Sequence, residues 1–382
     1  MQSRRNEFSI PAGVRYLNCA YMAPIPRVVE EAGLGGVRRK GDPSRIEARH
    51  FFEESDLARR LFAELIDADP EGVAIVPGVS YGVEIVARNL SPRPGQRIVV
   101  LAEQFPANVY PWKAVAERTG AYLYTVERPV PGESWSAAVI DAVDSDTALV
   151  TLGQVHWTDG SLLDLEAIGA RAREVGAAFV IDGTQSIGAL PFSVGRLKPD
   201  AVVCACYKWL LGPYSVGLAW IGERFRGGEP VEYTWLGRPG SEDFRALVDY
   251  RDELRPDASR FDSAERANFA LMPMTVAGLE YVLALGPEAV QAHGRTITDH
   301  VVEGVLALDM APPEGPRSGH IVGLSLPAGV DGGGLHRALT ERGIYVSRRG
   351  AALRISPHVY NDLADADALV GALRTELTPE AS

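Results

Sequence analysis

The chain has 382 residues, of which 46% are hydrophobic and 23% are charged, values typical of a globular protein with a large buried core. Its formal net charge of −12 argues against a nucleic acid or an anionic membrane surface as the main partner, because those partners require clustered Lys and Arg. Arg4 and Arg5 are followed by no apolar run, so we expect no secretory signal peptide and a cytoplasmic location.

Helical and strand patterns alternate through the first two thirds of the chain. Residues 43–67 are predicted to form a long helix, and a second helix is predicted to begin within the segment 76–90. Short apolar runs predict strands at residues 97–103, 147–155, 177–182, 200–207 and 215–222. An amphipathic helix is predicted at residues 164–176. This alternation is typical of parallel strands joined by helical crossovers and predicts an α/β fold.

The apolar stretch 201–222 carries one charge, Lys208, near its centre. Its length would suit a membrane-spanning helix. However, the pair Gly212-Pro213 would break such a helix, so we predict two short buried strands instead.

The pattern changes after about residue 255. Helical segments at 274–285 and 365–377 are combined with short strands at 320–327 and 352–357, which suits a smaller α+β domain. We therefore predict an N-terminal arm contributing to the small domain, a large cofactor-binding domain and a small C-terminal domain, at residues 1–40, 41–255 and 256–382.

Polar and aromatic side chains gather at three predicted strand ends, residues 154–157, 182–185 and 207–209. In open parallel sheets, ligands bind beyond the carboxyl ends of the strands. Asp182 and Lys208 bring a buried acid and a buried amine to this edge, and unpaired buried charges are costly. Three explanations stand: the two form a structural salt bridge, Asp182 caps the following helix, or both flank a cofactor.

Pyridoxal 5'-phosphate (PLP) meets these requirements. Its aldehyde needs an amine for a Schiff base, which Lys208 offers in apolar surroundings that favour deprotonation. Its pyridine nitrogen needs a carboxylate, which Asp182 can supply. Its phosphate suits the backbone N–H groups of a helix start at Val79 and Ser80. Its ring needs an apolar face, which Phe105 can provide.

The run AFVIDGTQSIGALPFSVGRLKPDAVVCACYKWLLGPYSVGLAWI resembles the cofactor-binding core of class V aminotransferases. These fold type I PLP enzymes include cysteine desulfurases, kynureninases and isopenicillin N epimerase-like proteins. Asp182 and Lys208 lie 26 positions apart (208 − 182), as in the family, and Gln185 follows the acid by three residues. The resemblance extends from YLNCAYMAPIP to LRISPHVYND. It implies an α/β fold type I transferase with a mainly parallel central sheet flanked by helices and a smaller α+β C-terminal domain.

The resemblance also implies roles for single residues around the cofactor. Lys208 is similar to the Schiff-base lysine, Asp182 to the pyridinium partner, and Gln185 to the hydrogen-bond donor to the phenolic oxygen. Ser80 is similar to the phosphate-binding hydroxyl, although it can also simply cap its helix. Tyr207 matches a position that contacts the phosphate.

Further roles follow for the ring face and the substrate. Phe105 is similar to the ring-stacking residue, unless it only fills the core. Arg354 is similar to the arginine that clamps the substrate carboxylate, a task that suits a bidentate guanidinium; its alternative is a pair with Asp362. Trp157 stands where relatives place a cofactor contact. His156 beside it is either a substrate contact or a structural histidine.

The departures from the family pattern bear on the reaction. The chain has three cysteines, which fit neither a disulfide framework nor a zinc site, so we expect no metal: Cys19, Cys204 and Cys206. Desulfurases need a nucleophilic cysteine late in the chain, and none follows Cys206, which argues against a persulfide-forming desulfurase. Ala205 stands where desulfurases have a hydroxyl residue. The segment 260–269 resembles a stretch that reaches the neighbouring subunit's cofactor, which implies a homodimer.

We therefore expect an enzyme that acts at Cα and Cβ of an amino-acid substrate through an external aldimine. Our hypothesis is a carbon–sulfur β-lyase on a cysteine-derived substrate, with Lys208 as the acid–base group. Transamination, epimerisation and decarboxylation remain open, as does a non-catalytic binding protein with this fold. A dinucleotide-binding oxidoreductase fits poorly, because GLGGVRRKG at 33–41 lacks the third glycine of the fingerprint.

Overall fold

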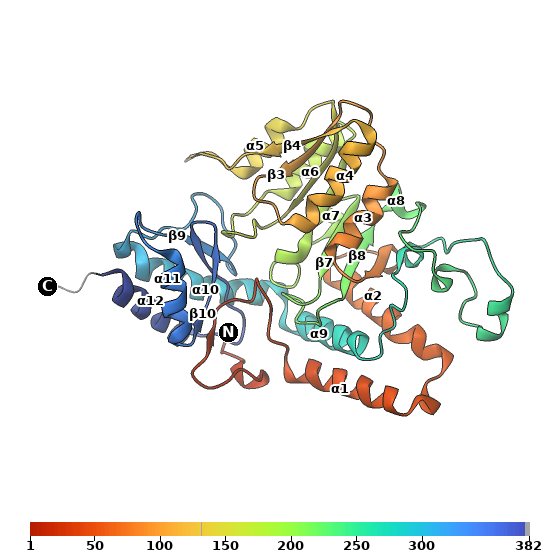
Figure 1. The fold of residues 1–382 in the computed structure, drawn as a ribbon, viewed down its shortest axis with the longest axis horizontal. Helices are drawn as coiled ribbons and strands as arrows, with labels where there is room; N and C mark the ends of the chain where they lie inside the picture. The colour runs from red at the N-terminus through yellow and green to blue at the C-terminus, as the bar shows by residue number, and fades with distance from the viewer. Residues whose placement is uncertain (131, 379–382) are drawn as a thin grey trace.

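The computed structural model describes residues 1–130 and 132–378, so the last four residues of the predicted C-terminal domain lie outside it. Its largest feature is a seven-stranded sheet in the order β2-β8-β7-β6-β5-β3-β4 (Figure 1). The strands are β2 (Val73–Val76), β3 (Arg97–Leu101), β4 (Tyr122–Val126), β5 (Thr147–Gly153), β6 (Ala178–Asp182), β7 (Ala201–Ala205) and β8 (Gly217–Ile221). The five predicted strands of the large domain are confirmed, whereas β2 and β4 were not predicted.

The sheet is mainly parallel, as the resemblance implies. Strands β3 to β7 run parallel, whereas β8 pairs antiparallel with both β7 and β2. Residues 206–216 join β7 to β8, too short a connection for the helical crossover that a parallel pair needs. The chain therefore turns back immediately after β7, and Lys208 lies in this turn.

Helices cover both faces of the sheet, because its strands are apolar on both sides. Val180 and Val203 point to the face covered by α3 (Val79–Asn89) and α4 (Tyr110–Thr119). Ile181 and Val202 point to the opposite face. That face is covered by α2 (Glu53–Leu65), α5 (Trp135–Ala142), α6 (Leu165–Glu174) and α9 (Leu271–Leu285).

The prediction of one long helix over residues 43–67 is wrong at its start. Only α2 is a regular helix, and the preceding residues form the short 3₁₀ turns η2 (Pro43–Arg45) and η3 (Ala48–Phe51). The Glu47 backbone N–H donates to His50 Nδ1 (2.8 Å), and the Ser44 hydroxyl donates to Asp42 (2.6 Å). Such local bonds between side chains and neighbouring groups compete with helix formation.

The helix α1 (Arg27–Gly41), for which no bounds were predicted, packs along α9 at the bottom of Figure 1. Glycines permit the close contact: a Cβ on Gly36 would lie 1.7 Å from the carbonyl oxygen of Phe269. In turn, α9 contributes Met272 and Leu279 to the core under the large sheet, although it follows residue 255. The division into domains at that residue stays a prediction.

The C-terminal part combines an antiparallel sheet with helices, as predicted. The sheet order is β11-β12-β9, formed by β9 (Val322–Ser325), β11 (Ser347–Arg349) and β12 (Ala352–Ile355). The helices are α10 (Pro287–Val305), α11 (Gly332–Glu341) and α12 (Leu363–Leu377). The N-terminal arm joins this part through β1 (Arg15–Tyr16), which pairs with β10 (Ile344–Tyr345). None of the described helices has the length and apolar character needed to cross a bilayer.

Candidate active site

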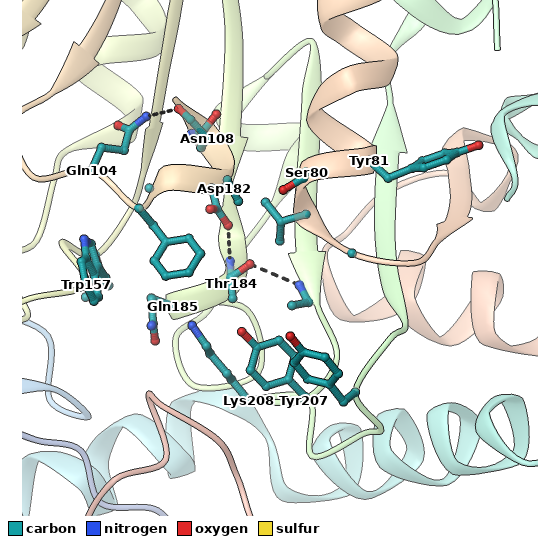
Figure 2. Close-up of a pocket in the computed structure, with 18 of the residues that line it drawn as sticks. Ser80, Tyr81, Gln104, Asn108, Trp157, Asp182, Thr184, Gln185, Tyr207 and Lys208 are labelled. Atoms are coloured by element: carbon teal, nitrogen blue, oxygen red, sulfur yellow. Dashed lines mark hydrogen bonds between the residues drawn. The ribbon is translucent and has the colours of Figure 1, made fainter. Parts of the chain in front are cut away.

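A cavity of about 410 Å³ lies at the carboxyl ends of β5, β6 and β7 (Figure 2). In the close-up, Ser80 lies at the start of α3 on one side, Lys208 and Tyr207 lie on the opposite side, and Asp182 and Thr184 lie between them. Nine of the ten residues predicted for the site line this cavity: Val79, Ser80, Phe105, His156, Trp157, Asp182, Gln185, Tyr207 and Lys208. The tenth, Arg354, is buried next to Trp157.

Lys208 is a buried amine without a polar partner. It is 4% exposed, and its side chain makes no hydrogen bond or ion pair with the residues that the structure describes. Its Nζ lies 5.2 Å from the centre of the Phe105 ring. Burial lowers the pKa of Lys208 from 10.5 to about 8; the charge of Arg354 acts in the same direction and Asp182 opposes it. Such an amine is partly neutral near physiological pH and can act as a nucleophile.

Asp182 ends β6 and caps the turn that follows. Its Oδ1 accepts a hydrogen bond from the Thr184 backbone N–H (3.0 Å), so it caps a 3₁₀ turn (Gly183–Gln185) and not the helix that was expected. No ion pair joins Asp182 to Lys208 in the described chain, so the salt-bridge alternative is wrong. Burial raises the pKa of Asp182, while the hydrogen bonds from Thr184 and the charge of Lys208 oppose this shift. A cation placed in the cavity would favour the ionised form.

The side-chain amide of Gln185 is held in one orientation. Trp209 Nε1 donates to Gln185 Oε1 (2.9 Å), and Gln185 Nε2 donates to the carbonyl oxygen of Ala20 (3.1 Å). A primary amide has two N–H donors, so one remains on Nε2. Because Gln185 lines the cavity, this amide can donate to an acceptor bound there.

Two aromatic rings form one wall of the cavity. Phe105 is 37% exposed and lines the cavity, so the alternative that it fills the core is wrong. Its ring meets Trp157 edge to face, with centroids 5.3 Å apart. Trp157 is held in turn by a hydrogen bond from its Nε1 to the carbonyl oxygen of Glu103 (2.6 Å).

His156 is bound on both ring nitrogens by protein groups. Its Nδ1 lies 2.7 Å from the Thr158 hydroxyl and its Nε2 lies 3.2 Å from the carbonyl oxygen of Ala102. Its ring stacks on Trp135, and burial lowers its pKa. These contacts are those of a structural histidine that supports the cavity wall; a substrate contact through this ring stays a prediction.

The first turn of α3 opens onto the cavity. Its N-cap is Gly78, and no side chain caps it. The alternative that Ser80 caps the helix is therefore wrong, and the Ser80 hydroxyl lines the cavity. Free N–H groups and the helix dipole make such an end a binding site for anions. Across the cavity, burial raises the pKa of Tyr207 to about 12, and its ring contacts that of Tyr214 at 4.8 Å.

Arg354 is fully buried in β12 and reaches toward Trp157. Its Nη1 donates to the carbonyl oxygen of Trp157 (2.7 Å), and its Cζ lies 5.8 Å from the centre of the indole. The alternative pair with Asp362 is wrong, because Asp362 caps α12 through the Ala364 N–H. Burial lowers the pKa of Arg354 to about 9, and the charge of Arg349 adds to this effect.

Three residues near the site were assigned no role from the sequence, although two of them lie in the strand-end segments 182–185 and 207–209: Thr184, Asn108 and Trp209. The Thr184 hydroxyl lines the cavity and accepts a hydrogen bond from the Ala205 N–H (3.2 Å), so a hydroxyl stands beside the alanine that departs from the family. Asn108 also lines the cavity, and its buried Nδ2 has no partner in the described chain. Thr184 and Asn108 both follow strand ends, which is the signal that could have identified them.

These residues fit PLP. The cavity is lined by a buried amine without a partner, a carboxylate, an aromatic wall, an amide donor and an uncapped helix start. No ion is needed to explain the set, because each group matches one part of the cofactor: the aldehyde, ring nitrogen, ring face, phenolic oxygen and phosphate.

Comparison with known proteins gives a consistent result. Residues 37–369 match the family described as Aminotransferase class-V. The chain is 28% identical over 387 residues to isopenicillin N epimerase from Streptomyces clavuligerus, covering 97% of each chain. It is 26% identical over 348 residues to a probable cysteine desulfurase from Pyrococcus abyssi, covering 84% of this chain and 82% of that one. Among solved structures, the cystine C-S lyase C-DES in complex with cysteine persulfide shares the fold, with a TM-score of 0.86 at 21% identity over 96% of this chain and 99% of that one.

Proposed function

The chain belongs to the class V aminotransferase family and is a PLP-dependent enzyme; on that premise we propose that it is a carbon–sulfur β-lyase acting on a cysteine-derived amino acid. One observation carries the choice of reaction. All three cysteines, Cys19, Cys204 and Cys206, are fully buried, so none exposes a thiol that could accept sulfur. Burial raises the pKa of Cys206 to about 12, so its thiol stays protonated. An elimination needs no such nucleophile.

In this proposal, five residues of the cavity each contact one part of the cofactor. The first turn of α3 and the Ser80 hydroxyl would bind the phosphate, and Tyr207 would reach it from the opposite side of the cavity. Asp182 pairs with the ring nitrogen, Gln185 donates to the phenolic oxygen, and Phe105 covers one face of the ring. Bound PLP supplies an electron sink for the charge that develops at Cα of the substrate. The aromatic wall and the burial of Lys208 keep water away from that charge.

Lys208 moves the proton. Its neutral amine takes the Cα proton, the electron pair of the Cα–H bond forms a Cα=Cβ bond, and the Cβ–S bond breaks with its electron pair leaving on sulfur as a thiolate. The lysine ammonium returns its proton to the thiolate. Water then hydrolyses the released 2-aminoacrylate, so that one S-substituted cysteine and one water give one thiol, one pyruvate and one ammonium.

The test is the product of the reaction. The holoenzyme is incubated with S-methyl-L-cysteine and, separately, with S-carboxymethyl-L-cysteine, and pyruvate, ammonium and thiol are measured for each. Equal amounts of the three, lost in Lys208→Ala, are the expected result. An exchange of amino groups with a 2-oxo acid that yields no thiol would show an aminotransferase instead.

Epimerisation is the second candidate, since the relative named isopenicillin N epimerase matches 97% of this chain. It would return the proton to Cα from the opposite face and leave the Cβ–S bond intact. Exchange of the Cα proton with deuterium from the solvent, together with formation of the D-amino acid and without pyruvate, would favour this candidate.

We also propose a homodimer. The segment that follows α8 (Glu223–Arg226) extends away from the rest of the molecule, and α1 lies at the bottom edge of the molecule (Figure 1). Both expose large apolar side chains: Val28, Val37, Tyr233, Val248 and Tyr250. Exposed apolar patches mark interaction sites. Light scattering after size-exclusion chromatography is expected to give twice 41.2 kDa, whereas a mass of 41.2 kDa would contradict the dimer.

A further inference from the structure

Two arginines from the neighbouring strands β11 and β12 lie against the same indole. The Cζ atoms of Arg349 and Arg354 lie 5.3 Å and 5.8 Å from the centre of the Trp157 ring. The sheet explains this placement. Ser347 of β11 pairs with Arg354 of β12, and Arg349 is two residues further along β11. Side chains alternate along a strand and cross-strand partners share a face, so Arg349 and Arg354 face the same way while Arg348 faces the other.

No carboxylate neutralises this pair within the described chain. Neither Arg349 nor Arg354 forms an ion pair there, and the Nε atom of each is buried without a hydrogen-bond partner. The two acids that line the neighbouring hollow with Arg349 are Glu103 and Asp159, and Arg128 already pairs with both.

The charge balance of the site is therefore incomplete. The charges of both arginines lower the pKa of Lys208, so three cations act on one another across the cavity wall. Asp182 opposes this shift, but it pairs with neither arginine. Arg354 is buried and Arg349 is half-buried, and like charges in such places destabilise one another unless an anion lies among them. An ordinary α-carboxylate supplies one negative charge, enough for Arg354. The cofactor phosphate belongs to the other side of the cavity, at Ser80 (Figure 2).

We propose that the substrate is an amino acid with a second acidic group, whose α-carboxylate binds Arg354 and whose distal acid binds Arg349. This inference rests on the proposed function and narrows it. For the lyase, the acid is a carboxylate on the substituent that the sulfur carries. A separate hollow of about 390 Å³, lined by Arg349, Gly350 and Thr158, lies beside the Trp157 segment.

The experiment compares two ligands of nearly equal shape. S-carboxymethyl-L-cysteine carries the distal acid, and S-carbamoylmethyl-L-cysteine carries a neutral amide in its place. Binding to the holoenzyme is followed by the change in visible absorption of the cofactor. The carboxylate can form a charged, bidentate hydrogen bond with the guanidinium of Arg349, which the amide cannot. The acid is therefore expected to bind at least about tenfold more tightly than the amide.

Variants assign this preference to one side chain. In Arg349→Gln, affinity for the acid is expected to fall about tenfold, while affinity for the amide changes less than about twofold. The matched control is Arg348→Gln, one residue away on the opposite face, which keeps the preference. If Arg349→Gln does not fold, Arg349→Lys is used in its place. This variant keeps the positive charge but loses the bidentate guanidinium, so it should retain only part of the preference for the acid.

The outcomes separate the inference from the function it rests on. Equal binding of acid and amide by the wild-type protein overturns the inference, as does an Arg349→Gln variant that keeps the preference; in both cases the PLP enzyme stands. A wild-type protein that gains no visible absorption with PLP overturns the proposed function and the inference together.

Discussion

Lys208 combines a reactive amine with a site that disfavours its charge. Burial lowers its pKa to about 8, and Arg354 contributes to the shift. Only the neutral amine attacks an aldehyde. The rate at which the apoprotein captures PLP is therefore expected to rise with pH and to level off above about pH 8. Stopped-flow absorption between about pH 6 and 10 measures this rate.

The variant Arg354→Gln is the control for that profile. Because the charge of Arg354 lowers the pKa of Lys208, its removal is expected to move the midpoint toward the ordinary lysine value of 10.5. A wild-type rate that keeps rising through pH 10, as for an exposed lysine, would contradict the account of the site.

At this scale the sequence predicted the polar groups of the cavity but not their partners. Asp182 stands out because it ends a buried strand, and Lys208 because it is the one charge in an apolar stretch, three residues after a buried strand ends. The bond from Trp209 to Gln185 joins residues 24 positions apart, and the bond from Arg354 to Trp157 spans 197 positions. Such contacts depend on how the elements pack, which spacing along the chain does not reveal.

At the scale of elements, α1 shows why a helix can escape prediction. Its glycines have low helix propensity, yet Gly36 lets it approach Phe269. We expect Gly36→Ala to destabilise the protein by about 2 kcal/mol or more through overpacking. Gly35→Ala is the matched control: a Cβ there meets nothing within 4 Å, so it should stabilise the helix by about 0.5–1 kcal/mol. Urea unfolding measures both, and equal midpoints for the two variants would contradict the packing argument.

Asp262 lies between α8 and α9 and connects this segment to β2. Fully buried, it pairs with Arg59 and with Arg266 (3.1 Å) and accepts the Ile75 N–H (2.8 Å). Asp262→Asn removes the buried counter-ion of two buried arginines and leaves only the exposed Asp56 beside Arg59, so we expect a loss of about 3–5 kcal/mol in the free energy of unfolding.

The control for Asp262 is an exposed ion pair of the same type. Asp243 pairs with Arg245 on the surface, and Asp243→Asn should leave the unfolding midpoint unchanged. A similar midpoint for both variants would show that the buried cluster does not hold the segment.

At the scale of the whole molecule, the alternation of strands and helices predicted the α/β sheet. The two edge strands, β2 and β4, were not predicted. β2 joins the sheet by pairing with β8, where Val76 meets Gly217, 141 positions away (217 − 76). Loop length alone shows that β8 must turn back, but not which strand lies beyond it. The pairing of β2 with β8 places the turn that carries Lys208 inside the sheet, next to the carboxyl ends of the parallel strands.

The chain has four lysines, which makes the central claim directly measurable: Lys40, Lys113, Lys198 and Lys208. Only Lys208 is buried. The protein is loaded with PLP, reduced with borohydride, digested and analysed by mass spectrometry. The account predicts one pyridoxyl group per chain, on the peptide that contains Lys208 and on no other. Label spread over the three exposed lysines, or full labelling of Lys208→Ala, would contradict it.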